Sequence, residues 1–298
     1  VGYESRIELR MESPHLTPVA WEQPAVRDDF DTQPLGLKWN FFGPPDLQDW
    51  SLTERPGAVC LHGNAAHLDA GMGCVWLGCR QEHFDCEVQT SLDFSPTSEG
   101  EEAGLTVWMD PLHHYEIYVL HEAGKRLVAV RRRIGSLSAR VASQEVPDGP
   151  VILCVRANRI FYSFAWITKE GRECNLATGE TRYLSSEVAG GFTGVYFALY
   201  ASGNGRKNTT PAYFDWFDYR SLENSGRLGI DSPIKELFRD ERAREILNRN
   251  MPELLANPVA DWQANFSLVD FYAMSPENIT AQHILSIDRE LRVANIAA

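Results

Sequence analysis

The sequence lacks the features that mark several common classes of protein. No apolar run approaches the roughly 18–20 residues that a membrane-spanning helix needs. Basic residues are few: 28 Lys and Arg stand against 41 Asp and Glu, which gives a formal net charge of −13. Nucleic-acid binding depends on clustered positive charge, and the single basic run, residues 131–133, is short. The composition therefore predicts neither a membrane protein nor a nucleic-acid-binding protein.

The six cysteines follow no metal-binding pattern, because no pair has the C-x-x-C spacing of a zinc ribbon. Cys86 and Cys154 instead fall on the apolar phase of strand-like runs, where a thiol packs as a small hydrophobe. Buried free thiols are therefore favoured, and a disulfide framework stays the alternative.

A recognisable beginning is also missing. The chain starts with Val1, and neither the charged segment nor the apolar segment of a signal peptide follows it. We therefore expect a processed, cut or truncated end, and the sequence indicates no cellular compartment.

Three zones follow one another along the chain. Residues 1–26 contain Pro14, Pro18 and Pro24, which block regular helix, and we expect them to form an extended arm or linker. Residues 27–222 carry strand signals, and residues 226–298 carry helix signals. Aromatic residues make up 11% of the chain, which suits a β-rich core or a sugar-facing surface.

Alternating sequences dominate the middle zone. From Phe84 to Phe94, apolar residues or Thr occupy every second position, which predicts a strand with one buried and one wet face. Turn residues such as Ala123-Gly124 separate such runs, and no helix signal lies between them. This order predicts a mainly β protein, an antiparallel sandwich closer to a lectin-like jelly roll than to an immunoglobulin domain. The other expected strands are residues 37–42, 50–54, 58–62, 103–109, 114–121, 126–133, 151–157, 160–167, 194–201 and 212–219.

The last zone has helical periodicity and predicts a small α-helical module. Ser232-Pro233 is expected to start a helix that continues to about residue 249. Leu268 lies in a shorter expected helix, and Ser275-Pro276-Glu277 is expected to start the last one. Isolated helices of this length are marginal in water, so their apolar stripes must pack on each other or on the sandwich.

Six short motifs in the middle zone together resemble a known family. In this order they are similar to the C-terminal concanavalin A-like β-sandwich of family 43 glycoside hydrolases, of the β-xylosidase or α-arabinofuranosidase type. Residues 226–298 resemble, less specifically, a small helical appendage found at the ends of various carbohydrate-active enzymes. The six motifs are Asp28–Asp31, Trp50–Gly57, Arg80–Asp85, Glu99–Leu105, Gly190–Gly194 and Phe214–Tyr219.

The resemblance implies a division of labour between two domains. In this family an N-terminal five-bladed β-propeller hydrolyses the substrate with inversion, one carboxylate acting as general base on water and a carboxylic acid protonating the leaving oxygen. The 298 residues leave no room for that propeller, so we expect this chain alone to be non-catalytic. Residues 1–26 resemble the segment that joins the propeller to the sandwich. The implied partners are the propeller, on the same precursor or a separate chain, and a xylan- or arabinoxylan-type oligosaccharide.

Phe192 is the expected sugar contact. The resemblance implies that a loop of the sandwich places an aromatic side chain at the rim of the sugar pocket, and Gly190–Gly194 is the matching motif. An aromatic face packs on the C–H face of a sugar ring, and the flanking glycines permit a tight bend. The alternative is that Phe192 begins the strand 194–201 and packs in the core.

Arg80, Gln81, His83 and Asp85 are expected at the interface with the propeller domain. His83 and Asp85 share one strand face because their spacing is two residues. No nucleophile motif completes a catalytic arrangement around them, so a purely structural hydrogen-bonded pair is the alternative to an interface role.

No catalytic residue and no cofactor are expected in this chain. The oxygen donors Asp28, Asp29 and Asp215 are weak candidates for a structural calcium ion near the first and last strands, although no ligand loop of defined spacing contains them. Glu99–Glu102 is expected to be a solvated acidic turn rather than a catalytic carboxylate pair. Residues 131–133 are expected on a solvated strand face.

Three functions stay open. The first is an accessory sandwich that supports and rims the active site of the propeller. The second is a free-standing carbohydrate-binding module, for which some of Trp76, Trp108, Tyr115 and Tyr118 would form an aromatic platform while the others lie in the core. The third is a structural domain whose helical tail mediates assembly, so a homo-oligomer stays open as well.

The exposed surface distinguishes the first two functions. An exposed apolar surface near residues 80–85 or Phe192 would favour the accessory role. A concave aromatic groove without such a surface would favour independent sugar binding.

Overall fold

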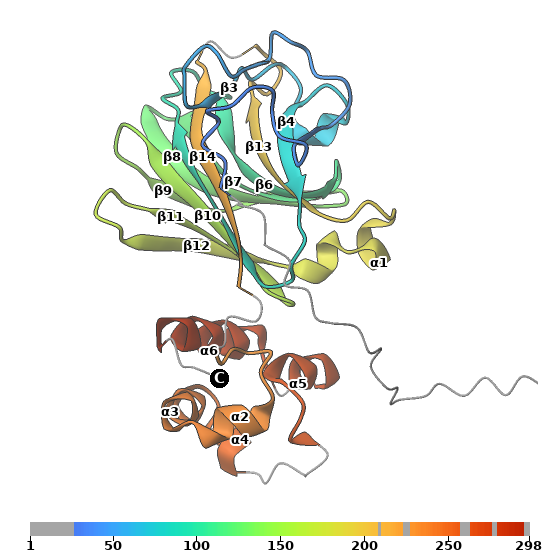
Figure 1. The fold of residues 1–298 in the computed structure, drawn as a ribbon, viewed down its shortest axis with the longest axis vertical. Helices are drawn as coiled ribbons and strands as arrows, with labels where there is room; N and C mark the ends of the chain where they lie inside the picture. The colour runs from blue at the N-terminus through green and yellow to red at the C-terminus, as the bar shows by residue number, and fades with distance from the viewer. Residues whose placement is uncertain (1–26, 208–209, 223–226, 257–262, 276–278, 295–298) are drawn as a thin grey trace, which may run out of the picture.

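The structure is a computed structural model in which two antiparallel sheets pack face to face and a group of helices lies at one end of them (Figure 1). This architecture confirms the mainly β sandwich with a C-terminal helical part that the sequence predicts. The arm expected over residues 1–26 lies outside the described residues. The structure describes residues 27–207, 210–222, 227–256, 263–275 and 279–294.

The first sheet has seven strands in the order β1-β4-β13-β6-β7-β8-β9. Strands β6 to β9 form a meander, in which consecutive strands pair directly and short turns set their register. The strands are β1 (Asn40–Phe41), β4 (Val75–Arg80), β13 (Tyr196–Ser202), β6 (Glu102–Asp110), β7 (His113–Glu122), β8 (Lys125–Ile134) and β9 (Leu137–Glu145).

The second sheet also has seven strands, in the order β12-β11-β10-β5-β14-β3-β2. Strand β5 pairs with β10 on one side and with β14 on the other, so segments far apart in the sequence become neighbours. The strands are β12 (Glu173–Glu180), β11 (Phe161–Ile167), β10 (Val151–Ala157), β5 (Cys86–Asp93), β14 (Ala212–Ser221), β3 (Val59–Leu61) and β2 (Trp50–Ser51).

The core between the sheets follows from the alternation along the strands. In β5 the even-numbered residues Cys86, Val88 and Leu92 are fully buried, whereas Glu87 and Gln89 are only partly buried on the other face. The strand expected from Phe84 to Phe94 is therefore confirmed, with slightly narrower bounds. Its inner face packs against the inner face of the first sheet in one continuous apolar cluster.

The sequence patterns miss three strands and overstate others. Strand β4 carries no alternation because Val75 through Cys79 are all buried, and β9 carries none because almost every residue is exposed. Strand β12 is partly buried along nearly its whole length. The expected strands 37–42 and 50–54 shrink to two residues each, β1 and β2.

The first expected helix of the tail is in fact two helices, α2 (Ile234–Arg239) and α3 (Glu241–Asn250). Asp240 between them has extended backbone angles, and its side chain accepts a hydrogen bond from the backbone N–H of Ala243 at 2.8 Å, which caps α3. The expected start at Ser232 is also wrong, because Pro233 holds the N-cap position and the Ser232 hydroxyl accepts from the backbone N–H of Gly229.

The remaining helices are short apart from the last one. The shorter helix expected around Leu268 is confirmed, and Ser267 with Asp270 forms its capping box. The last helix begins at Ala281, and Ser275 ends the preceding helix instead of starting this one. The elements not yet named are the 3-10 turns η1 (Leu68–Ala70) and η2 (Thr181–Leu184), and the helices α1 (Ser186–Ala189), α4 (Pro252–Ala256), α5 (Leu268–Met274) and α6 (Ala281–Ala294).

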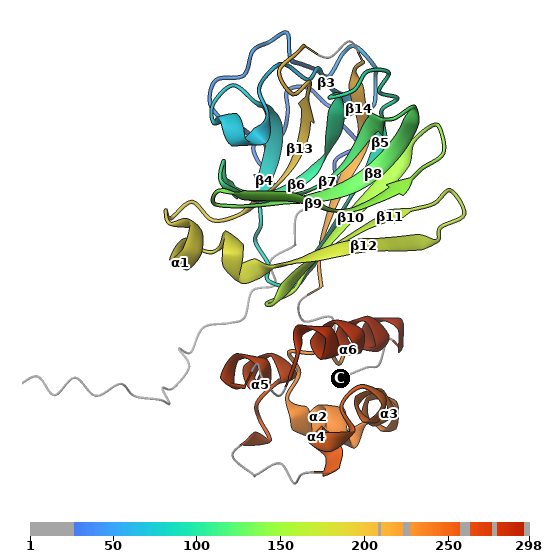
Figure 2. The same cartoon turned by 180° about the vertical axis from the view of Figure 1, so that it is seen from behind.

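The helices pack on one another and on one end of the sandwich, as Figure 2 shows from behind. Ile284, Ile287 and Leu291 of α6 are buried in an apolar cluster that also contains Ile160 and Phe161 at the start of β11. The sequence predicts that the apolar stripes of the tail pack on each other or on the sandwich, and the structure shows both. None of the described helices is both long and apolar enough to cross a membrane.

All six cysteines are free thiols, which confirms the preference over a disulfide framework. Four of them are buried and two are partly buried. The buried thiols are Cys60, Cys79, Cys86 and Cys154.

Candidate functional site

Phe192 lies at the tip of a glycine-rich loop between α1 and β13, and its side chain is fully exposed, at 100%. Gly190, Gly191 and Gly194 all have positive φ, between 73° and 78°, which other residues adopt only at a cost. In Figures 1 and 2 the segment between α1 and β13 projects from the side of the sandwich, next to α1. The alternative that Phe192 packs in the core is therefore wrong.

The end of β4 anchors this loop. The Arg80 guanidinium donates a hydrogen bond to the backbone carbonyl of Thr193 and lies 4.6 Å from the ring centroid of Tyr196. The backbone N–H of Gln81 donates to the carbonyl of Val195 at 2.9 Å. Two strand ends thus hold the base of the loop while its tip projects into solvent.

Two buried tyrosines fix the segment that follows β4. The Tyr219 hydroxyl accepts hydrogen bonds from the backbone N–H groups of Glu82 and His83 at 3.0 and 3.1 Å, and lies 3.0 Å from Nδ1 of His83. The Tyr162 hydroxyl donates to the Gln81 side-chain carbonyl at 2.8 Å. Burial raises the pKa of both tyrosines well above the ordinary value, so both stay neutral. Arg80 and Gln81 therefore bind the base of the Phe192 loop, and the two tyrosines fix Gln81 and His83 in the segment that follows β4.

Asp85 faces a different part of the molecule. Its carboxylate accepts a hydrogen bond from Arg292 of α6 at 2.8 Å, and Arg292 also contacts Asp288 at 3.0 Å. Burial raises the pKa of Asp85, and the Arg292 charge opposes that rise. Within this chain Asp85 joins the sandwich to the helices rather than pairing with His83, whose ring contacts Tyr219.

The aspartates expected to hold calcium have protein partners. Asp28 accepts from the indole N–H of Trp39 at 2.8 Å, and Asp29 pairs with Arg27 at 2.7 Å. Asp215 accepts from the Ser91 hydroxyl at 3.3 Å. Within the described residues these three carboxylates do not gather into one ligand group. A calcium ion at any of them stays a prediction and would have to displace these donors.

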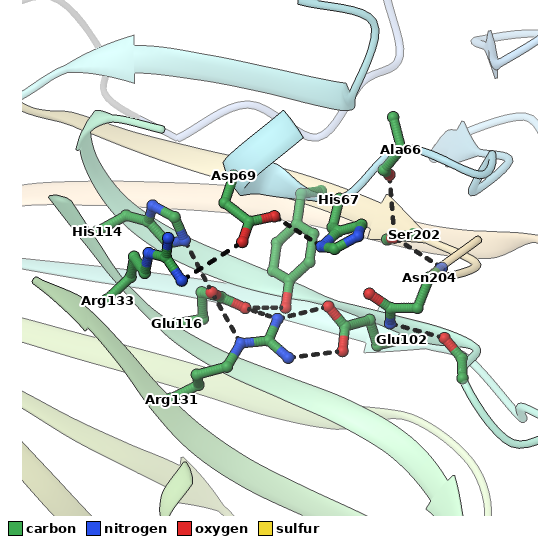
Figure 3. A network of polar contacts seen from close by, with 12 residues as sticks. Ala66, His67, Asp69, Glu102, His114, Glu116, Arg131, Arg133, Ser202 and Asn204 are labelled. Carbon is green, nitrogen blue, oxygen red and sulfur yellow. Dashed lines mark hydrogen bonds and ion pairs between the residues drawn. The ribbon is translucent and has the colours of Figure 1, made fainter. Parts of the chain in front are cut away.

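A buried cluster of charges lies on the outer face of the first sheet (Figure 3). The Arg131 guanidinium donates to both oxygens of Glu102, at 2.6 and 3.1 Å, and to both oxygens of Glu116. The Tyr200 hydroxyl donates to Glu116 at 2.7 Å, and His114 Nε2 lies 3.2 Å from the same carboxylate. The expected solvated location is therefore wrong for both Glu102 and Arg131.

The other acidic residues of the motif Glu99–Leu105 differ in burial: Glu101 is buried and Glu99 is exposed. Glu101 is buried, and its carboxylate accepts from the backbone N–H of Thr97 at 3.0 Å and from the hydroxyl of Thr210 at 3.0 Å. Only Glu99 is exposed as expected. The motif thus closes a loop through buried hydrogen bonds instead of forming a wet turn.

The two glutamates of the cluster do not form a glycosidase acid pair. Burial raises the pKa of Glu102, and the Glu116 charge adds to that rise. Burial also opposes ionisation of Glu116, but the Arg131 charge and the His114 hydrogen bond outweigh it and lower its pKa to about 2. Both carboxylates bind one guanidinium, so no space for a glycosidic bond lies between them. The cluster is structural.

The four aromatic residues considered for a sugar platform are buried. Trp76, Trp108 and Tyr118 lie on the outer face of the first sheet beneath Leu68 of η1, at 2–4% exposure. Tyr115 lies in the core between the sheets, fully buried. An exposed platform built from these four residues is therefore excluded.

A cavity of about 230 Å³ opens beside β1, β2 and β3. Its walls include Phe41, Trp50 and Trp76, and its polar side holds Asn64, which donates to Asp49 at 2.7 Å. The indole N–H groups of Trp50 and Trp76 are buried and have no hydrogen-bond partner among the described residues. An apolar, aromatic wall with a few polar groups is a typical feature of sites for small ligands.

A larger groove, of about 1110 Å³, lies between the second sheet and α6. Most of its charged side chains are already paired across it: Arg156 contacts Glu87 at 2.5 Å and Glu173 at 2.6 Å. These pairs stabilise the junction and leave few groups to bind a ligand.

Two packed antiparallel sheets of seven strands each define a large β-sandwich of the jelly-roll, lectin-like kind. Residues 27–220 match the family model of the β-xylosidase C-terminal concanavalin A-like domain, so the chain belongs to this family.

Curated relatives and solved structures agree with this assignment. The chain is 38% identical over 224 residues to the non-reducing end α-L-arabinofuranosidase BoGH43B of Bacteroides ovatus, covering 75% of this chain and 42% of the relative. It is 27% identical over 222 residues to a xylan 1,3-β-xylosidase of a Vibrio species, covering 71% of this chain and 40% of the relative. The chain thus spans less than half the length of these curated relatives.

Two solved structures superpose on most of this chain and, like the curated relatives, are more than twice as long as the part they share with it. The Bacteroides ovatus xyloglucan-locus GH43B superposes with a TM-score of 0.65 at 39% identity, covering 70% of this chain and 42% of that chain. The xylan β-1,4-xylosidase from Bacillus halodurans C-125 superposes with a TM-score of 0.63 at 27% identity, covering 70% and 41%.

Proposed function

We propose that this chain serves as the accessory sandwich of a glycosidase that acts on xylan- or arabinoxylan-type oligosaccharides, and that it supports and rims the active site of a β-propeller domain. The names of the relatives, an arabinofuranosidase and a xylosidase, support this class of substrate. The 42% coverage of the first relative leaves length for a separate catalytic domain. The two catalytic carboxylates would belong to that domain.

The fully exposed Phe192 is the observation that carries the proposal. An aromatic side chain that stays in water contributes no free energy of burial. One that packs against a sugar ring or a neighbouring domain removes apolar area from water, which is favourable. Phe84 and Val188 are also exposed, at 58% and 47%, on the two segments that hydrogen bond through Arg80 and Gln81. Exposed apolar side chains on both segments favour a docking face for the propeller, although the Arg159 guanidinium lies over the Phe84 ring at 4.3 Å.

The test uses a chimeric enzyme in which this chain replaces the matched C-terminal segment of the Bacteroides ovatus relative. Phe192→Ala should raise KM for an aryl arabinofuranoside about tenfold with little change in kcat, because a lost rim contact weakens ground-state binding. The control is Leu137→Ala on β9, where the side chain is also exposed (74%) but lies on a distant edge strand.

Two results would contradict the proposal. One is an equal response of the chimera to both substitutions. The other is hydrolysis of aryl xylosides or arabinosides by the purified chain alone, abolished by a single substitution within it.

The cavity beside β2 favours a second candidate, independent carbohydrate binding. Phe41, Trp50 and Trp76 line this cavity, and an aromatic wall can pack on the C–H face of a sugar ring. Calorimetric titration of the isolated chain with xylo-oligosaccharides distinguishes the candidates. Binding that is lost in Trp50→Ala and kept in Phe192→Ala would favour a binding module over the accessory role.

A further inference from the structure

Three metal-ligating side chains of different chemistry meet at the end of β3. The Nε2 atom of His62 lies 2.7 Å from a carboxylate oxygen of Glu54 and 3.5 Å from the sulfur of Cys60. All three ligand atoms lie within 4.8 Å of one another. Their sequence spacing matches no common zinc motif, so the sequence alone does not reveal the group.

The local fold brings these residues together. Cys60 and His62 are two residues apart, so their side chains share one face of the extended chain. The loop between β2 and β3 turns at Gly57, which has φ +77°, and returns Glu54 to the same face. Cys60 is fully buried, whereas the side chains of His62 and Glu54 are 28% and 36% exposed, which leaves one side of the group open to solvent.

We propose that Glu54, Cys60 and His62 form a binding site for one divalent cation of the zinc class, with water as the fourth ligand. Thiolate and imidazole ligands disfavour Ca²⁺ and Mg²⁺ and suit Zn²⁺ or Co²⁺. One thiolate and one carboxylate neutralise the 2+ charge, which suits a half-buried site.

Of the two ligand-atom distances from His62, the one to Cys60 already fits tetrahedral coordination, and the one to Glu54 requires a shift of the carboxylate. Metal–sulfur and metal–nitrogen bonds of about 2.3 and 2.0 Å place the two ligand atoms about 3.5 Å apart, as Cys60 and His62 already are. The contact between His62 and Glu54 must open from 2.7 Å to about 3.3 Å to give the tetrahedral separation. The Glu54 side chain lies in the loop between β2 and β3 and is 36% exposed, which leaves room for this shift.

Tyr213, next to the three ligands, orients the Glu54 carboxylate. The Tyr213 hydroxyl donates to the second oxygen of Glu54 at 2.9 Å, which orients the carboxylate toward the site. The nearby cation Arg55 stacks on the Tyr213 ring and pairs with Asp93 at 2.7 Å, so its charge is compensated. When the cation binds, the Cys60 S–H bond breaks, a metal–sulfur bond forms and one proton leaves to solvent.

Cobalt titration of the reduced, chelator-treated chain tests the proposal. We expect one equivalent of Co²⁺ to produce the visible bands of four-coordinate cobalt and the near-ultraviolet sulfur-to-cobalt charge-transfer band, with Zn²⁺ displacing it. Cys60→Ser should abolish the charge-transfer band, and Cys74→Ser, which changes a partly buried thiol away from the site, should keep it.

Tyr213→Phe keeps all three ligands and is the second variant. It should weaken Co²⁺ binding about 10-fold or more, because an outer partner of the ligating carboxylate is lost. A wild-type chain without the charge-transfer band overturns the proposal. So does a band that persists in Cys60→Ser, which would place the thiolate elsewhere.

Discussion

Replacing Arg131 with Met would leave two buried carboxylates without the cation that they share. Glu116 is fully buried and Glu102 is 4% exposed, and among the described residues Arg131 is the arginine or lysine that pairs with each of them. Breaking a buried ion pair by removing one partner costs about 3–5 kcal/mol. Because domains are stable by only about 5–15 kcal/mol, we expect a large fall in the free energy of unfolding.

Urea unfolding followed by tryptophan fluorescence measures this loss. Arg140→Met is the matched control, because Arg140 pairs with Glu122 at 2.9 Å on the surface, and such a pair is worth about 0–1 kcal/mol. A triple variant that also changes Glu102 and Glu116 to Gln removes every charge of the trio and should recover part of the loss. A single variant less than about 1 kcal/mol below wild type would refute the assignment of these residues as one charge-compensated cluster.

The pH dependence of the stability difference between wild type and Arg131→Met is an independent test of the cluster. In the wild type the pKa of Glu116 is lowered to about 2, so its stabilising contribution is full above about pH 4.5, the unfolded value, and is lost as the pH falls toward 2. Without Arg131, burial raises the pKa of both carboxyl groups, while the His114 hydrogen bond still opposes that rise at Glu116. Acid therefore relieves the variant by protonating the buried carboxylates. The stability difference between the two proteins should therefore shrink on acidification. A difference that grows below pH 5 would contradict the argument.

Two further predictions concern the junction and the first sheet. Arg292→Ala should loosen the helices from the sandwich, and a double-mutant cycle with Asp85→Asn should give a coupling of about 1.5–3 kcal/mol, as for a hydrogen bond to a charged group; a coupling near zero would show that the contact is not formed in solution. Gly104→Ala should destabilise by about 1–3 kcal/mol or more, because the new Cβ would lie 2.2 Å from a backbone carbonyl oxygen of β7; an unchanged melting temperature would contradict this close approach.

The strands that the sequence predicts are those with one wet face. Period-two alternation exists in β5 because Glu87 and Gln89 meet solvent while Val88 and Leu92 do not. Strand β4 lies under η1 on one side and over the core on the other, so both of its faces are apolar and the period disappears. Strand β9 at the sheet edge is exposed on both faces, and its period disappears for the opposite reason.

The Phe192 loop and the Arg131 cluster differ in how far the sequence predicts them. The exposed tip at Phe192 follows from local chemistry, since glycines on both sides can only serve a bend. The Arg131 cluster depends on register, which local patterns do not contain. The turn at residues 123–124 nevertheless fixes it: pairing Glu122 with Lys125 and counting six residues outward on each strand brings Glu116 opposite Arg131. Turn-anchored counting is therefore the signal that would have found the cluster.

The construction of the Phe192 loop bears on how much a partner could gain from it. Full burial of an aromatic side chain is worth about 1.5–3 kcal/mol, and ordering a free loop would cancel much of that gain. Here Arg80 and Gln81 already hold the base of the loop through hydrogen bonds to Thr193 and Val195, so less ordering remains when the tip is covered. A net gain near 1.4 kcal/mol is a factor of about ten in binding, which is the change in KM expected for Phe192→Ala. By the same reasoning Arg80→Ala should weaken sugar binding. The Arg80 guanidinium donates to the loop backbone, so its removal would free the loop that presents the Phe192 ring.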